Sequence, residues 1–143
     1  MSTPEDGRVE LGLELAQAVL AAQPFSVHVG AKVTAFGDGA ATLEIPVVPE
    51  LLQQNGYVHG GVLAYAADNA ITFAGGSVLG PEVLTGGMHI DYVAAAQGEL
   101  LVAEATVVQA SARRATCRCD VFAVDPAGAR TLCAVAQGNV IAR

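Results

Sequence analysis

Residues 55–69 read NGYVHGGVLAYAADN, a glycine turn with a histidine that runs directly into an apolar helix. Glycines at the start of a helix expose backbone N–H groups at the positive end of the helix dipole. Asp68 is a lone carboxylate in this apolar helix, where a charge is costly unless something uses it. The N–H groups can stabilise negative charge, and the carboxylate can act as a base or nucleophile. The stretch therefore predicts a catalytic site built on one helix.

Helical patterns occur twice in the chain. Apolar residues cover every side of the segment from 61 to about 75, and a helix that is apolar all round is buried. Gly75-Gly76 predicts its end. Residues 10–23 have apolar side chains near helical spacing, and Pro24 predicts the end of this short N-terminal helix.

Strand patterns fill much of the remaining chain. The expected strands are residues 27–36, 40–48, 83–94, 99–110, 114–124 and 129–142. Gly37-Asp38-Gly39 predicts a hairpin turn, and residues 49–54 are a connector with room for one helical turn. Several strands reach about ten residues, against a typical five or six. Long antiparallel strands with one wholly apolar helix predict an α+β fold, in which a curved sheet wraps around that helix.

Bulk properties limit the class of protein. A length of 143 residues predicts a single domain over 1–143, of which 1–8 are expected to be flexible. No apolar run is expected to span a membrane, and the polar, acidic start is unlike a signal peptide. Three cysteines without metal-site or disulfide spacing predict reduced thiols and a cytoplasmic protein. The net charge of −7 argues against nucleic acid as a partner.

The order of elements and the motif together resemble the hotdog-fold acyl-CoA thioesterases of the phenylacetate-degradation, PaaI-like type. The specific residues are Gln53, Gly56, the run His59-Gly60-Gly61 and Asp68, with a weaker similarity over 85–98. The resemblance covers nearly the whole chain. One departure is the run Ala94-Ala95-Ala96, where relatives often carry an Arg-Pro pair that some could use as a basic contact to coenzyme A.

The resemblance implies roles for individual residues. The Gly61 N–H would polarise the thioester carbonyl, and Asp68 would be the nucleophile or the general base. Gln53 would orient substrate or water, and Thr85 would lie near that water. For His59, shaping of the turn by a hydrogen bond is favoured over a direct acid–base role. Candidates for substrate binding are Gly60, Asn55, Tyr57, Arg113 and Arg114, the two arginines as contacts to the coenzyme A phosphates.

The spacing of the motif bears on assembly. Asp68 lies seven residues after Gly61, which is two helical turns, or about 10 Å along the axis. That is too far for the carboxylate to act on a carbonyl held at the same helix's N-terminus. A second subunit with an antiparallel helix would bring its carboxylate there, so the spacing predicts a two-fold homodimer with two composite sites. The resemblance implies that such dimers pair into tetramers.

Acyl-CoA thioester hydrolysis without metal or cofactor is the function that these residues favour. A hotdog dehydratase or hydratase, or a non-catalytic acyl-CoA-binding protein, are the alternatives. By strand parity, Thr85, His89 and Asp91 are expected on one face of their strand. A polar outer or interface face is the favoured interpretation for His89 and Asp91.

Overall fold

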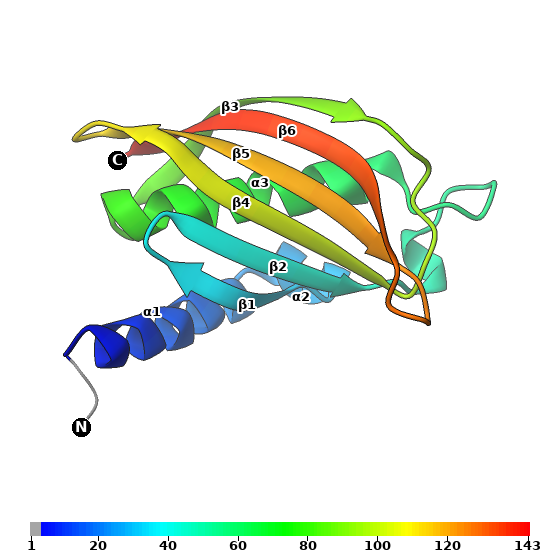
Figure 1. Cartoon of the computed structure of the whole chain (residues 1–143), viewed down its shortest axis with the longest axis horizontal. Coiled ribbons are helices and arrows are strands. Elements are labelled where there is room, and N and C mark those ends of the chain that lie inside the picture. The colour runs from blue at the N-terminus through cyan, green and yellow to red at the C-terminus, as the bar shows by residue number, and fades with distance from the viewer. Residues whose placement is uncertain (1–3) are drawn as a thin grey trace.

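The fold is one antiparallel sheet curved around a long helix (Figure 1). A computed structural model describes residues 4–143, with side chains described from residue 12. The helices are α1 (Pro4–Ala21), α2 (Pro24–Val29), the 3-10 turn η1 (Pro49–Leu51) and α3 (Gly60–Leu79). The strands are β1 (Lys32–Gly37), β2 (Ala40–Pro46), β3 (Val83–Tyr92), β4 (Leu100–Ala110), β5 (Arg114–Val124) and β6 (Arg130–Ala142). The expected α+β hotdog arrangement, with its central and N-terminal helices, is confirmed.

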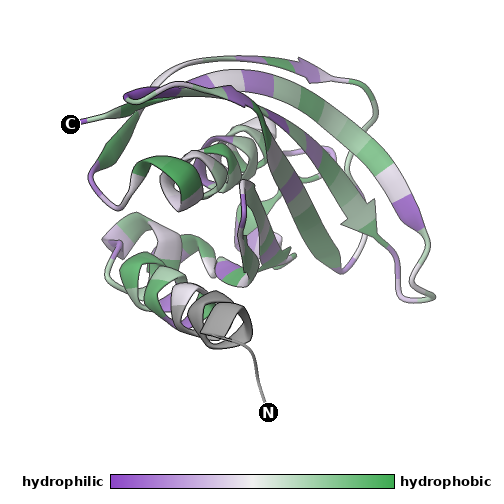
Figure 2. Ribbon diagram, turned by 60° about the vertical axis from the view of Figure 1, so that its left-hand side comes forward, coloured by the Kyte–Doolittle hydropathy of each residue, from purple (hydrophilic) through white to green (hydrophobic). Residues whose placement is uncertain are grey.

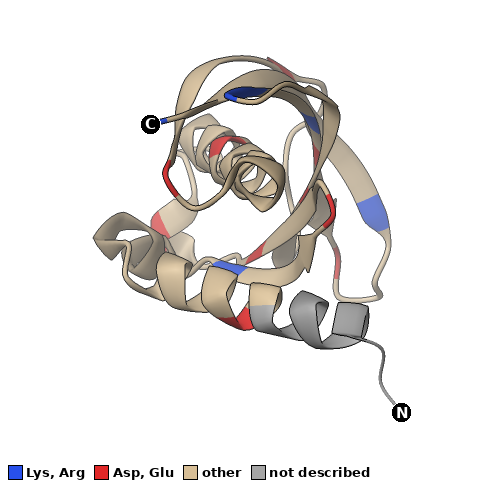
Figure 3. Cartoon of the chain, turned by 90° about the vertical axis from the view of Figure 1, so that its left-hand side faces the viewer, with Lys and Arg blue, Asp and Glu red and all other residues tan. Residues whose placement is uncertain are grey.

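The six strands lie in the order β1-β2-β4-β5-β6-β3, and every neighbouring pair is antiparallel. Helix α3 packs on the concave face of the sheet. The view along the molecule shows the sheet curving around this helix (Figure 3). Helix α1 lies against β1. The order leaves β3, which follows α3 in the chain, at one edge of the sheet.

Small side chains form much of the core between sheet and helix. On β5 the inward-facing residues are Ala115, Cys117, Cys119, Val121 and Ala123, all buried as the alternation predicts. Buried hydrophobic residues come from the sheet and from α3, and both carry stretches of hydrophobic residues (Figure 2). Because these side chains are short, α3 lies close to the strands, and bulk added at the contact has little room.

The prediction of one strand over 27–36 is wrong, because this segment begins as a helix. Pro24 begins α2 in a position where its missing N–H costs nothing, and Gly30 ends it at φ 88°. Buried Ser26 anchors α2 to α3: its Oγ accepts from the Tyr65 hydroxyl at 2.5 Å and lies 3.3 Å from the Asn69 Nδ2. The strand then starts at Lys32.

Helix α3 does not end at Gly75-Gly76 but runs on to Leu79. A Cβ at position 75 would lie 2.7 Å from the Cβ of Val140 on β6. Gly75 is therefore required by a close helix–strand contact rather than by a helix end. The helix stops at Gly80, whose φ of 101° suits glycine.

Other local predictions agree with the structure. The turn at 37–39 joins β1 to β2 with positive φ at all three residues, and the connector after β2 contains η1. The expected flexibility concerns residues 1–8. Their side chains lie outside the described part of the structure, as does the backbone of residues 1–3. Contrary to the expectation, α3 is long and apolar enough to span a membrane. The sheet covers this helix, and the core helices of soluble proteins meet the same criteria of length and composition.

Candidate functional site

The N-terminus of α3 is held by His59. Its Nδ1 accepts a hydrogen bond from the Gly61 N–H at 2.8 Å, so His59 is the N-cap of the helix. A ring nitrogen that accepts a hydrogen bond does so through its lone pair, and the donors of this histidine are limited to Nε2. The N–H of Gly61 is thus already engaged, whereas no acceptor within residues 4–143 bonds the N–H of Gly60. A carbonyl oxygen brought to this turn would meet an unused donor at Gly60 and would compete with His59 for the donor at Gly61.

A cavity of about 300 Å³ lies against this turn. Its lining residues are Gln53, Tyr57, Val58, Gly60, Leu63, Tyr92, Val93, Ala94, Ala95 and Ala96. The fold thus brings Gln53 and Tyr57 to the helix N-terminus, where the first half of the predicted site is expected. The three alanines present only methyl groups and backbone at the position where relatives often carry the Arg-Pro pair.

The loop before α3 positions Gln53 by its backbone. The Gln53 N–H donates to the Tyr57 carbonyl at 2.8 Å, and the Gly56 N–H donates to the Gln53 carbonyl at 3.0 Å. The Gln53 Oε1 accepts from the backbone N–H of Asn55. Its Nε2 remains as the group that can donate to a ligand. Asn55 itself contributes its backbone to the turn, and its side chain is exposed.

Asp68 forms a second polar group in the middle of α3. The Thr85 hydroxyl donates to Asp68 Oδ1 at 2.5 Å, and the Thr72 Oγ1 lies 2.7 Å from the Thr85 Oγ1. Because Thr85 donates its only hydroxyl proton to Asp68, Thr72 is the donor in the hydrogen bond between the two threonines. The Thr72 Oγ1 is also 2.8 Å from the Asp68 carbonyl, so its proton is shared between two acceptors. No donor among the described residues contacts Asp68 Oδ2, which leaves this oxygen for chemistry.

Thr72 escaped the sequence analysis. The available signal was its spacing, since residues four apart on a helix are neighbours on one face. A threonine one turn after the lone carboxylate could have been read as its support.

Thr85 reaches Asp68 because β3 contains an irregularity. The pairing of β3 with β6 shifts register between Thr85 and Gly87, which turns Thr85 toward α3. The prediction that Thr85 shares a face with His89 and Asp91 is therefore wrong. His89 Nε2 and Asp91 Oδ2 lie 3.1 Å apart on the exposed side of the strand.

The two halves of the site remain separate in one chain. Gly61 and Asp68 are two turns apart on α3, about 10 Å along the axis. Thr85 lies on β3, whose other side is the open edge of the described sheet. One chain therefore offers two half-sites, one with amide donors and one with a carboxylate.

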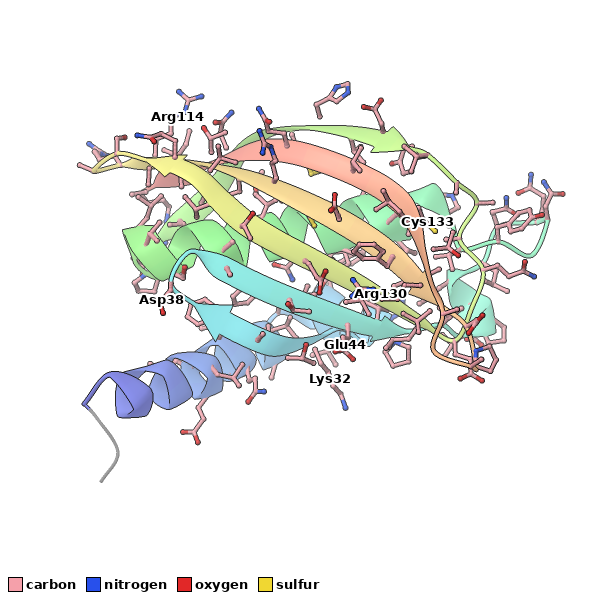
Figure 4. The ribbon with its side chains drawn as sticks, viewed as in Figure 1. Lys32, Asp38, Glu44, Arg114, Arg130 and Cys133 are labelled. Atoms are coloured by element: carbon pink, nitrogen blue, oxygen red, sulfur yellow. The ribbon has the colours of Figure 1, made fainter. Side chains whose placement is uncertain are left out.

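Arg113 and Arg114 lie at the β4–β5 hairpin, away from the cavity at Gln53. The Arg113 carbonyl accepts from the N–H of Ala142, which pairs with Val83 at the start of β3. The arginines thus lie at the same end of the sheet as Thr85. Arg114 precedes the buried Ala115, and its side chain points to the outer side of the sheet (Figure 4).

The three cysteines, Cys117, Cys119 and Cys133, are free and buried. Burial raises the pKa of the Cys119 thiol to about 12, with a further contribution from the nearby Asp120 carboxylate. Such thiols stay protonated and are poor nucleophiles. Within the described residues, no group of His, Cys, Asp and Glu is arranged to hold a metal ion.

Comparison with known proteins gives a consistent result. A family model described as "Thioesterase superfamily" matches residues 55–129. No curated protein sequence matches. Among solved structures, a thioesterase family protein from Silicibacter pomeroyi is similar at a TM-score of 0.86 and 24% identity, covering 92% of this chain and 97% of that chain. A mutant of the phenylacetic acid degradation protein PaaI from Thermus thermophilus is 29% identical at a TM-score of 0.74, covering 85% and 100%. The E. coli PaaI protein shares the fold at a TM-score of 0.80 with 18% identity, covering 94% and 95%.

Proposed function

Because the chain belongs to the thioesterase superfamily, we propose that it hydrolyses an acyl-coenzyme A thioester to the free acid and coenzyme A. The observation that carries this proposal is the pair of half-sites on α3. One presents the unused backbone N–H of Gly60 beside the Gly61 N–H, which His59 holds until a substrate oxygen replaces it, and the other presents Asp68 held by Thr85. A thioester needs both, because its carbonyl gains negative charge when its carbon is attacked.

The proposed active unit is a homodimer formed along β3. An unpaired edge strand offers its N–H and C=O groups to another strand, and β3 is ten residues long. Antiparallel pairing of two β3 strands around a two-fold axis would place the two α3 helices side by side in opposite directions. Asp68 of one subunit would then approach the helix N-terminus of the other. A further pairing of dimers into a tetramer is part of the proposal but is not required for the chemistry.

In this site the thioester oxygen accepts hydrogen bonds from the amide donors at the start of α3. Either Asp68 Oδ2 takes a proton from water, whose oxygen attacks the carbonyl carbon, or Oδ2 attacks directly and water then cleaves the resulting anhydride. In both routes the C–S bond breaks and coenzyme A leaves as a thiolate that takes up a proton. Gln53 Nε2 orients substrate or water, and His59 keeps the turn in shape. Loss of one amide donor in such a site typically costs about 10²–10³ in rate.

Tyr57 and Asn55, beside the cavity at Gln53, are proposed to contact the substrate, and Arg113 or Arg114 the coenzyme A phosphates. No separate cofactor is proposed, since coenzyme A is part of the substrate. The reduced, buried thiols support a cytoplasmic location. The bond from His59 to backbone, rather than to a carboxylate, speaks against a dehydratase or hydratase, which would pair a histidine with an acid.

The test is hydrolysis of a panel of acyl- and aryl-CoA thioesters, followed by the release of free thiol. Asp68→Asn should remove most of the activity and leave the thermal unfolding curve unchanged, while the control Asp38→Asn in the exposed β1–β2 turn should keep full activity. No turnover of any thioester by the unaltered protein would refute the proposal. A change in enoyl thioester absorbance would instead support a hydratase, and binding without turnover would support a binding protein.

Composite sites can be tested by mixing. Asp68→Asn and Gln53→Ala damage different half-sites, so each variant alone should be inactive. A mixed dimer would contain one site with Gln53 from one chain and Asp68 from the other, and activity should partly return on subunit exchange. If each site lay within one chain, mixing would restore nothing.

A further inference from the structure

A groove of about 380 Å³ runs between α1 and the C-terminal half of α3. We propose that it receives the acyl chain of the substrate and that this chain is apolar and uncharged. The inference rests on the proposed thioesterase function and adds to it the class of acyl group and the residues that select it. Figure 2 shows α1 and α3 facing each other with hydrophobic residues on both.

The groove starts beside the proposed reaction centre. Thr72 is one of its lining residues, and its Oγ1 lies 2.7 Å from the Thr85 Oγ1, which donates to Asp68 Oδ1. One pair of hydrogen-bonded hydroxyls therefore separates the groove from the carboxylate. An acyl group whose carbonyl carbon is held at Asp68 has this groove as the adjoining apolar space. In the proposed dimer the Gln53 cavity of the other subunit adjoins the same carboxylate, and it is left for the coenzyme side of the thioester.

The lining of the groove indicates the chemistry of its ligand. Its described residues are Gly12, Leu15, Ala16, Val19, Gln23, Phe36, Asn69, Thr72, Phe73, Gly76, Ser77, Gly80, Pro81 and Val83. None of these residues carries a charge. A carboxylate or ammonium group on the acyl chain would lose its hydration here without gaining an ion partner, which is costly.

Several polar atoms of the groove already bond to other groups of the protein. Asn69 Nδ2 bonds the Tyr65 hydroxyl at 2.9 Å and Gln23 Oε1 at 3.2 Å. Ser77 Oγ accepts from the Gly39 N–H at 2.8 Å and donates to the Ala74 carbonyl at 2.7 Å. These bonded atoms gain little from a hydroxylated chain, and most of the other lining residues are apolar, so the groove favours plain hydrocarbon or an aryl ring.

The groove is larger than an acetyl group needs. A cavity of about 150 Å³ lined by apolar residues is enough for benzene. The groove, at about 380 Å³, has more than twice that volume and accommodates a medium-length chain or an arylacyl group.

Two positions on opposite walls control this volume. Gly76 on α3 has room for a methyl group, since a Cβ there would lie 3.5 Å from Val83 Cγ2, but a larger side chain must extend into the groove. Leu15 on α1 is 67% exposed at the rim, so a larger side chain there covers the entrance without disturbing the core.

The test measures kcat/KM for saturated acyl-CoA thioesters of increasing length, with hexanoyl-CoA compared with adipoyl-CoA, which ends in a carboxylate. In the unaltered protein, each methylene that enters the groove should raise kcat/KM about fourfold, the equivalent of about 0.8 kcal/mol. Adipoyl-CoA should react at least about tenfold more slowly than hexanoyl-CoA.

The variants Gly76→Leu and Leu15→Trp should remove the gain with chain length, so that longer thioesters react no faster than acetyl-CoA. Gly76→Ala and Ala18→Leu, on the exposed side of α1, are the matched controls and should keep the full length profile. Unfolding curves establish that each variant is folded, and Leu15→Trp provides the test if Gly76→Leu is not. If the protein hydrolyses thioesters but neither folded groove variant changes the dependence of kcat/KM on chain length, the groove does not bind the acyl chain. The proposed thioesterase function would then still stand. Hydrolysis of no thioester at all would overturn the proposed function, and the assignment with it.

Discussion

The adjacent glycines at 75 and 76 should respond in opposite directions to the same substitution. Both lie in α3, where alanine is favoured over glycine by about 1 kcal/mol. At position 75 a Cβ would lie 2.7 Å from both Cβ and Cγ2 of Val140, well inside the roughly 3.5–4.0 Å of a normal carbon contact. At position 76 the nearest atom is Val83 Cγ2 at 3.5 Å, which is an ordinary contact.

The magnitudes follow from these distances. Overpacking of a core costs about 1–3 kcal/mol, and two contacts this short on fully buried Val140 place Gly75→Ala at the upper end. After the gain in helix propensity, the variant should lose about 2 kcal/mol of unfolding free energy, whereas Gly76→Ala should gain about 1 kcal/mol. For a chain of this length, that is a fall of about 6 °C in Tm against a rise of about 3 °C.

The assay is thermal or urea unfolding at one fixed protein concentration, because the stability of an oligomer depends on concentration. Val140→Ala supplies the partner for a double-mutant cycle. Alone it should cost about 2 kcal/mol, but in combination with Gly75→Ala the new methyl group occupies vacated space and the losses should be less than additive. Equal stabilisation by alanine at 75 and 76, or additive losses in the cycle, would refute the view that Gly75 is set by contact with β6.

Three further predictions concern the site and the core. Thr85→Val should lower kcat/KM about 10- to 100-fold, since a hydrogen bond to a charged group is worth about 1.5–3 kcal/mol. Thr85→Ser keeps the hydroxyl and should retain most of the activity. Equal losses in the two variants would show that the hydroxyl does not support Asp68. His59→Asn should keep both the helix cap and the activity, whereas His59→Leu should cost about 1 kcal/mol of stability; loss of activity in a stable Asn variant would instead indicate an acid–base role. Burial raises the pKa of the Cys119 thiol from 9.0 to about 12 in the folded protein. Above pH 9 the folded state therefore keeps a proton that the unfolded state loses, and the free energy of unfolding should fall from pH 9 toward 12. Cys119→Ala should flatten this fall, and an unchanged slope would contradict the assignment.

Local patterns were sufficient wherever the physical cause lies within a few residues. The alternation of small apolar and polar residues gave the bounds of β5, and the glycines at 37–39 gave the hairpin. The all-round apolar surface of α3 identified the helix that the sheet encloses. The turn before it, with Asp68 two turns later, predicts two half-sites that a second chain would complete, and this stays a prediction.

The remaining features depend on contacts between residues far apart in the chain. Residues 27–29 are helical because Ser26 is bonded to α3, although the β-branched side chains of Val27 and Val29 favour a strand. Gly75 marks a close contact with Val140 on β6 rather than a helix end. Thr85 faces Asp68 because of a register shift in β3, which a period of two in the sequence does not reveal. The sequence by itself thus determined the long strands, the enclosed helix and the residues from which the chemistry of α3 is proposed. Only the tertiary structure decided which hydroxyls support Asp68 and where apolar space adjoins it, because both are set by packing between distant segments.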